Sequence, residues 1–180
     1  MILGVLLPLM LLAAAGIMVL LMILCLHDCR GRGRRRLIAL LGLSLGALGL
    51  LAPGRWVLRE YGLDWRSWVM FILMIALTGG VIGALVQTVL CFQELQGGEW
   101  GPDLTVASVL CAVLVLLVGY IGAFCIAAWA PDGERIVTWE GQKAVETAPI
   151  LMDDTRYDYY AYRGPIVQGE WLGSAKHPVE

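Results

Sequence analysis

The hydrophobic residues of the chain form four long runs, separated by short polar connections and followed by a polar tail. The runs cover residues 1–26, 37–52, 68–92 and 104–129, and none of them contains Asp, Glu, Lys or Arg. About 20 consecutive apolar residues are enough for a helix to cross the ~30 Å hydrocarbon core of a bilayer. The pattern predicts an all-α membrane protein, with four transmembrane helices in residues 1–130 and a small β-rich tail in residues 131–180.

The second run is the shortest of the four, because sixteen residues form a helix of only about 24 Å. Arg36 can snorkel at one end and the ring of Trp56 can lie at the other interface, which makes up the difference. Pro53-Gly54 follows the run, and proline in a helix interior removes a backbone hydrogen bond. The sequence therefore predicts that the second span ends at this pair.

The sequence of the tail predicts β-strands. Residues 135–139 and 143–147 flank Glu140-Gly141-Gln142, and β-branched residues around such a glycine-containing connection are typical of a β-hairpin. Residues 157–162 form a second strand candidate, in which side chains alternate between two faces. Its tyrosines therefore predict two covered faces, one under the hairpin and the other under the loop after the second span or under a partner.

Composition agrees with a membrane protein. Hydrophobic residues make up 59% of the chain and charged residues 16%, with a mean hydropathy of +0.75. Soluble domains average about 45–50% apolar and 25% charged residues. The five cysteines all lie in or beside the apolar runs, which excludes a disulfide framework of the kind that stabilises small secreted domains.

The orientation is predicted by a cluster of arginines in the connection after the first run. The cluster consists of Arg30, Arg32, Arg34, Arg35 and Arg36. Arginine beside a span is retained on the cytoplasmic side, so this loop is expected in the cytoplasm of a plasma (inner) membrane protein, with both termini and the tail outside. The same arginines could bind anionic lipids at about 1 kcal/mol each.

Aromatic residues on the outer side predict a recognition surface. Amphipathic rings collect at the headgroup level, and each can bury its body while its polar atom reaches water. Asp158 is expected to push the pKa of a neighbouring tyrosine upward, which disfavours a catalytic phenol. The predicted surface comprises Trp56, Trp65, Tyr157, Tyr159, Tyr160 and Tyr162.

Small residues recur at a spacing of four in three runs. They are Gly42 and Gly46, Gly79 and Gly83, and Gly119, Ala123 and Ala127. This spacing places them on one helix face, where backbones can approach closely. The faces predict either packing of the helices on one another, which we favour, or contact with a membrane-protein partner or a second copy of the chain.

Cys25, His27, Cys29 and Cys91 are expected near the inner membrane face, where metal or redox chemistry would need them within a few ångströms of each other. However, Cys25 and His27 point about 200° apart on a helix, so one element cannot present both. The cysteines are best explained as small apolar side chains that pack between helices. The sequence therefore predicts no metal site and no cofactor.

The runs and the tail lack several functional signatures. The spans carry no Asp, Glu, Lys or Arg, whereas ion carriers usually need an intramembrane ionisable group. The tail pairs no obvious nucleophile with a base, because it offers only Ser174 and His177. No glycine-rich phosphate loop occurs, and the basic cluster lacks the aromatic residues of a nucleic-acid site.

These observations favour a non-catalytic accessory or binding subunit with an extracytoplasmic recognition surface. The alternative is a subunit of an oligomeric small-solute channel or transporter, with a shared pore lined by Gln87 and the glycine faces. An intramembrane enzyme ranks last, since candidate catalytic residues are missing.

The tail also carries a resemblance. The order of Ile136-Val137, Gly141-Gln142-Lys143, the tyrosines of residues 157–162 and Gly164-Pro165 resembles small multi-span membrane proteins of low-GC Gram-positive bacteria. These have a few spans followed by a short tyrosine-rich β tail. The resemblance covers about the last quarter of the chain and implies a bacterial inner-membrane protein, without implying any catalytic residue.

Overall fold

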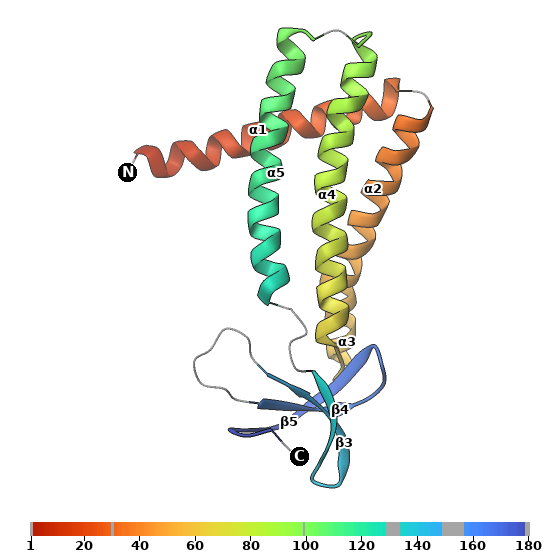
Figure 1. Cartoon of the computed structure of the whole chain (residues 1–180), viewed down its shortest axis with the longest axis vertical. Coiled ribbons are helices and arrows are strands. Elements are labelled where there is room, and N and C mark those ends of the chain that lie inside the picture. Colours follow the sequence, from red (N-terminus) through yellow and green to blue (C-terminus); the bar gives the residue numbers. More distant parts are fainter. Residues whose placement is uncertain (1, 30, 99, 129–133, 149–156, 179–180) are drawn as a thin grey trace. The chain divides into compact units, whose positions relative to one another are not determined.

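The computed structural model describes residues 2–29, 31–98, 100–128, 134–148 and 157–178. It is mostly helical, with a small antiparallel sheet formed mainly by the tail (Figure 1). The chain divides into two compact units, Met1–Leu45 with Ala76–Gly122 and Gly46–Ile75 with Ala123–Glu180. The predicted boundary at residues 130 and 131 lies outside the described residues.

The described residues contain four long helices: α1 (Ile2–Asp28), α2 (Arg32–Gly49), α4 (Ser67–Leu95) and α5 (Pro102–Ala128). Three helical segments in the described residues are long and apolar enough to cross a membrane: Arg32–Glu60, Ser67–Leu95 and Pro102–Ala127. Within α1, residues Leu12–Asp28 form a shorter apolar helix. The chain is therefore an integral membrane protein by helix length and composition.

Large apolar side chains remain exposed along all four helices. The most exposed include Leu20, Leu45, Ile72 and Leu116, at 67%, 67%, 53% and 73%. A soluble protein buries such rows, because contiguous exposed apolar surface is costly in water. Such rows suit contact with lipid chains, where a helix also satisfies its own backbone hydrogen bonds.

The prediction that the second span ends at Pro53-Gly54 is wrong. After α2 the helix continues through a π-helical segment, η1 (Leu50–Gly54), into α3 (Arg55–Glu60). Proline cannot donate a backbone hydrogen bond, and a π-helical turn accommodates the missing donor. In this segment the indole N–H of Trp65 donates to the Leu50 carbonyl at 3.1 Å. The helical segment of 29 residues is therefore long enough to cross the hydrocarbon core of a bilayer.

The arginine cluster also differs from the predicted loop. Arg32, Arg34, Arg35 and Arg36 lie in the first turns of α2 and are exposed, whereas Arg30 lies outside the described residues. The turn before α2 passes through Gly31 with φ 106°, a conformation that glycine adopts without steric cost. Arginine is a good helix former, so the helix begins directly after this glycine.

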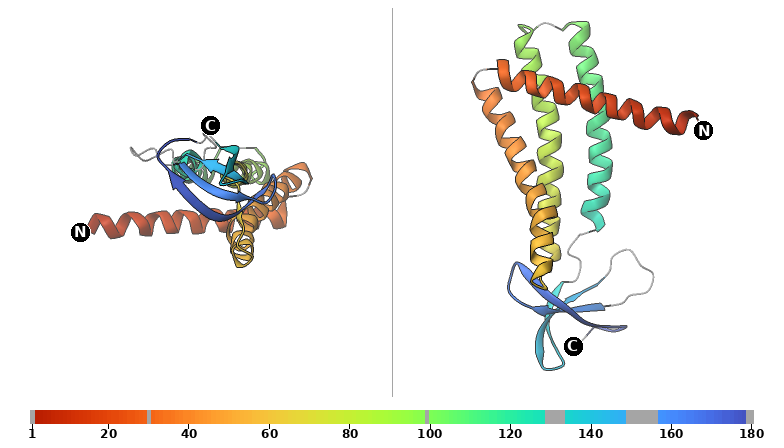
Figure 2. Two further views of the ribbon diagram at one scale, coloured as in Figure 1. Left: turned by 90° about the horizontal axis from the view of Figure 1, so that it is seen from below. Right: turned by 180° about the vertical axis from the view of Figure 1, so that it is seen from behind.

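In the first unit, α1 runs across α4 and α5 instead of alongside them (Figures 1 and 2). Met18 packs with Leu85 of α4 and with Cys111 and Leu114 of α5. Further along α1, the Cys25 thiol donates to the Thr88 carbonyl of α4 at 3.5 Å. One helix thus contacts two neighbours at successive positions.

Close helix packing uses different small residues from most of those predicted. A Cβ at Gly83 would lie 2.9 Å from Leu40 Cδ2, and one at Gly80 would meet the Ser44 hydroxyl and lie 3.2 Å from the Leu40 carbonyl oxygen. A Cβ at Gly122 would collide with Thr78. Of the predicted packing residues, only Gly83 is therefore at a tight helix contact.

The other predicted packing residues face away from such contacts. Among the described residues, no atom outside the local helix lies within 4 Å of a Cβ built at Gly42, Gly46, Gly79 or Gly119, and Ala123 is exposed. Neighbouring residues in a helix differ by 100°, so Gly79 and Gly80 cannot both face α2. Contact with Leu40 and Ser44 selects the face of Gly80 and Gly83.

In the described part of the second unit, five strands form an antiparallel sheet in the order β1-β5-β4-β3-β2. They are β1 (Asp64–Trp65), β2 (Arg135–Trp139), β3 (Gln142–Thr147), β4 (Tyr157–Tyr162) and β5 (Val167–Ala175). The predicted hairpin is confirmed, with Trp139 paired to Gln142 across Glu140 and Gly141. Both turn residues have positive φ, at 48° and 83°, as a two-residue hairpin turn requires.

We predict that Gly80→Ala destabilises the helical core and that Gly79→Ala does not. The new methyl at residue 80 meets the Leu40 carbonyl, which belongs to the backbone and cannot rotate away, so a cost of about 1–3 kcal/mol is expected. At residue 79 alanine restricts the unfolded chain and is neutral or stabilising. Thermal unfolding of both variants in the same detergent measures the difference, and equal midpoints would refute the assigned contact.

Candidate functional site

The loop after α3 and the tail form one structure. β1 pairs with β5, with Asp64 opposite Gln168 and Trp65 opposite Val167. Beyond β1, the Arg66 N–H donates to the Ile166 carbonyl at 3.1 Å, and the indole N–H of Trp68 donates to the Pro165 carbonyl at 3.0 Å. We name β1–β5 together with α3 and residues 61–66 the sheet module.

A buried ion pair lies inside the sheet module. Arg66 Nε donates to Glu134 Oε1 at 2.6 Å, and the two side chains are 10% and 6% exposed. The Arg66 guanidinium carbon also lies 6.0 Å from the centre of the Tyr162 ring. Breaking one partner of a buried pair leaves the other charge uncompensated, which typically costs about 3–5 kcal/mol.

A second ion pair links α3 to β1. Arg55 binds both carboxylate oxygens of Asp64, because Nε donates to Oδ1 at 2.8 Å and to Oδ2 at 3.1 Å, and Nη2 donates to Oδ2 at 2.8 Å. Arg59 Nη2 lies farther from the same carboxylate, at 3.7 Å, and is 62% exposed. The two-point contact of Arg55 fixes the orientation of α3 more tightly than a single charge contact would.

Tyr159 is a core residue, so its assignment to the recognition surface is corrected. Its side chain is 0% exposed, its ring stacks on Trp139 of the hairpin with centroids 3.9 Å apart, and its hydroxyl donates to Glu146 Oε2 at 3.1 Å. Glu146 is itself fully buried. The hairpin thus covers this face of β4, as predicted.

The other face of β4 lies against the loop after α3. Burial raises the pKa of Tyr160, the carboxylates of Asp158 and Asp64 raise it further, and Arg55 opposes them. The predicted effect of Asp158 is confirmed. A phenol with a raised pKa stays protonated at neutral pH, so the half-buried Tyr160 side chain is neutral where it packs.

The exposed aromatic residues of the sheet module differ from the predicted set. Trp56 is 65% exposed, whereas Trp65, Tyr157, Tyr160 and Tyr162 are only partly exposed. The sequence prediction missed several large exposed side chains, namely Tyr61 at 78%, Trp171 at 59%, Ile136 at 54% and Ile166 at 49%. We name Trp56, Tyr61, Ile136, Ile166 and Trp171 the exposed aromatic-aliphatic set.

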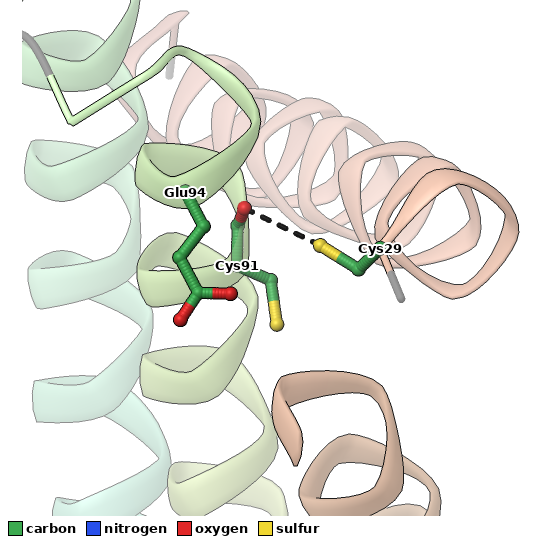
Figure 3. Close-up of side chains that lie close together, drawn as sticks. All are labelled: Cys29, Cys91 and Glu94. Carbon is green, nitrogen blue, oxygen red and sulfur yellow. Dashed lines mark hydrogen bonds between the residues drawn. The ribbon is translucent and has the colours of Figure 1, made fainter. Parts of the chain in front are cut away.

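The first unit contains a separate cluster of chemically reactive groups. The sulfur atoms of Cys29 and Cys91 and a carboxylate oxygen of Glu94 all lie within 4.8 Å of one another. Cys29 follows the last residue of α1, whereas Cys91 and Glu94 project from one side of α4 (Figure 3). Both cysteines are buried and Glu94 is exposed.

Neighbouring groups hold this cluster in place. The Cys29 thiol donates to the Cys91 carbonyl at 3.4 Å (Figure 3), and the Gln87 amide donates to Cys91 Sγ at 3.4 Å. A Cβ at Gly33, in the first turn of α2, would lie 3.0 Å from Cys91 Sγ and 3.3 Å from Glu94 Oε2. Glycine at this position therefore lets the α2 backbone approach the cluster.

The sequence anticipated part of this arrangement. Cys25, Cys29 and Cys91 do meet in one buried cluster, as expected. The His27 side chain points elsewhere, is 86% exposed and lies 2.6 Å from Asp28 Oδ1, in agreement with the predicted angular separation. Glu94 was missed, although its position three residues after Cys91 places both on the same face of a helix.

Comparison with known proteins finds no matching family model, no matching curated protein and no matching solved structure. The class of the protein therefore follows from its own structure: an integral membrane protein with three long apolar helical segments and a small antiparallel sheet.

We predict that Glu134→Gln destabilises the sheet module. The substitution keeps the shape of the side chain but leaves Arg66 without its negative partner, so a cost of about 3–5 kcal/mol is expected. Arg59→Gln is the matched control, because an exposed pair contributes only about 0–1 kcal/mol. Limited proteolysis of the full chain in detergent should cleave the tail of the Glu134 variant much faster, and equal cleavage of the two variants would contradict the prediction.

Proposed function

We propose that the chain is a non-catalytic accessory or binding subunit, whose sheet module lies outside the cytoplasm and recognises another protein. One observation carries the proposal: the sheet module is tied to the start of α4 by strand pairing and by the buried Arg66–Glu134 pair, yet it keeps large aromatic side chains exposed. Rigid exposed aromatic residues are enriched at the centres of protein interfaces.

The proposed orientation follows from the arginines at the start of α2. Arginine-rich segments beside a span stay in the cytoplasm, and three successive helical segments lead from Arg32 to the tail. An odd number of crossings places the sheet module on the opposite side from the arginines. This outcome does not depend on whether α1 crosses the membrane.

We propose α1 as the fourth span, with the N-terminus outside. Its 27 residues carry no charged side chain before Asp28, which is sufficient length for a crossing. In the competing arrangement, α1 lies in the cytoplasmic interface of the membrane. The course of α1 across α4 and α5 supports this second arrangement. The arginines at the start of α2 would bind anionic lipid headgroups in either arrangement.

The alternative function, an oligomeric channel or transporter subunit, finds less support. Gln87, proposed to line its pore, is 8% exposed and donates to Cys91 Sγ within one chain. The exposed faces of Gly42, Gly46 and Gly79 leave room for a second copy. A bacterial inner-membrane location remains a proposal that rests on the resemblance of the tail.

We predict that Ser174→Cys, in a chain whose native cysteines are replaced by serine, reacts with a membrane-impermeant thiol reagent on intact cells. Ser174 is exposed on β5, so its reactivity reports the side of the membrane on which the sheet module lies. A cysteine added before Met1 tests α1 in the same way. Reaction at residue 174 only after lysis would reverse the proposed orientation.

The proposed recognition surface can be tested by photocrosslinking in native membranes. A photoreactive residue at position 171 should form a defined adduct with another protein, and Glu134→Gln should abolish that adduct by destabilising the sheet module. Position 116 on α5 is the matched control, because Leu116 is 73% exposed and should crosslink to lipid. Adducts with lipid alone at both positions would contradict a protein-binding role.

A further inference from the structure

We propose that Cys29, Cys91 and Glu94 form a binding site for Zn²⁺. Two thiolates and one carboxylate are a donor set that Zn²⁺ accepts, since it binds sulfur and oxygen ligands in tetrahedral geometry. The carboxylate disfavours Cu⁺, which selects soft thiolate and thioether ligands, and the sulfur atoms disfavour Mg²⁺ and Ca²⁺, which select oxygen.

The observed distances suit this ion after a small contraction. The three ligand atoms lie within 4.8 Å of one another. Tetrahedral Zn²⁺, with bonds of about 2.3 Å to sulfur and 2.0–2.2 Å to oxygen, holds neighbouring ligands about 3.5–3.8 Å apart. Rotation of the Cys29 side chain and of the long, exposed Glu94 side chain can supply the remaining movement of about 1 Å.

A second observation points to a ligand at the same place. Gln87 is a polar side chain only 8% exposed, and its amide N–H is directed at Cys91 Sγ. A thiolate is a much better acceptor than a neutral thiol, because hydrogen bonds to charged groups are about twice as strong. Groups of this kind orient metal ligands, and their loss typically weakens metal binding about 10–100-fold.

The first turn of α2 supports negative charge in the cluster. Gly33 allows the helix N-terminus to approach Cys91 and Glu94, and the partial positive charge of a helix N-terminus stabilises anions. Glu94 is exposed, so one of the three proposed ligands lies at the surface of the cluster. A water molecule completes the fourth position.

Binding releases the protons of both thiols to solvent, so the affinity for Zn²⁺ rises with pH. Because Cys29 follows α1 and Cys91 lies in α4, the ion joins the end of α1 to α4. The thermal stability of the chain should therefore increase when Zn²⁺ is added.

The test uses the full chain, reduced and purified in detergent, titrated with Zn²⁺ against a chromophoric chelator and separately with Co²⁺. The wild type should bind one ion, and Co²⁺ should produce the near-ultraviolet absorption of a thiolate complex. Cys29→Ser, Cys91→Ser and Glu94→Gln should each weaken binding more than about 10-fold, and Gln87→Leu about 10-fold. Cys111→Ser, at a buried thiol packed against Met18, is the matched control and should bind as the wild type does.

Each other outcome overturns the assignment. A wild type that binds no ion after full reduction, or that binds Co²⁺ without thiolate absorption, has no such centre. Equal weakening by Cys111→Ser shows non-specific loss of structure. Glu94→Gln changes an exposed side chain and should preserve the fold, which circular dichroism verifies, so unchanged binding by that variant removes the carboxylate from the ligand set.

Discussion

The pairing of Arg66 with Glu134 is the interaction on which the sheet module depends. Arg66 lies between β1 and α4, and Glu134 directly precedes β2. One contact therefore joins the start of α4 to the first strand of the tail. Both side chains are almost completely buried, and neither charge could remain there without the other. The connection between α3 and α4 and the tail therefore form one unit, which explains how a tail of fifty residues without cysteine is stabilised.

The first unit depends on a different constraint, the close approach of helix backbones. Gly80, Gly83 and Gly122 remove side chains where Ser44, Leu40 and Thr78 press against the neighbouring helix. Between apolar helices in lipid, such contacts supply much of the association energy, because burial from water contributes little there. The same unit brings Cys29, Cys91 and Glu94 together, so helix packing positions the proposed metal ligands.

Local patterns were sufficient to predict the helices and the hairpin. Apolar length predicts a membrane helix because the bilayer demands a minimum span, and Glu140-Gly141 predicts a turn because its backbone needs positive φ. The Pro53 prediction failed because a local rule was overridden: a π-helical segment contains the proline, and the helix continues through it into α3. Of the three residues of the proposed metal site, Cys29 and Cys91 could be placed at the same end of their helices from the sequence. Glu94 could not, because the third apolar run ends at residue 92 and Glu94 was assigned to the loop that follows.

The sequence by itself determined that this is a membrane protein, where its apolar helices lie, and on which side its arginines are expected, because these properties depend on composition and length. Only the tertiary structure decided which face of each helix is internal, because glycines at residues 79 and 80 are chemically identical until a neighbour contacts one of them. Likewise, Tyr159 is held by Glu146, which lies 13 positions away in the chain, and Arg66 is paired with Glu134, which lies 68 positions away. No local pattern encodes a contact of that range.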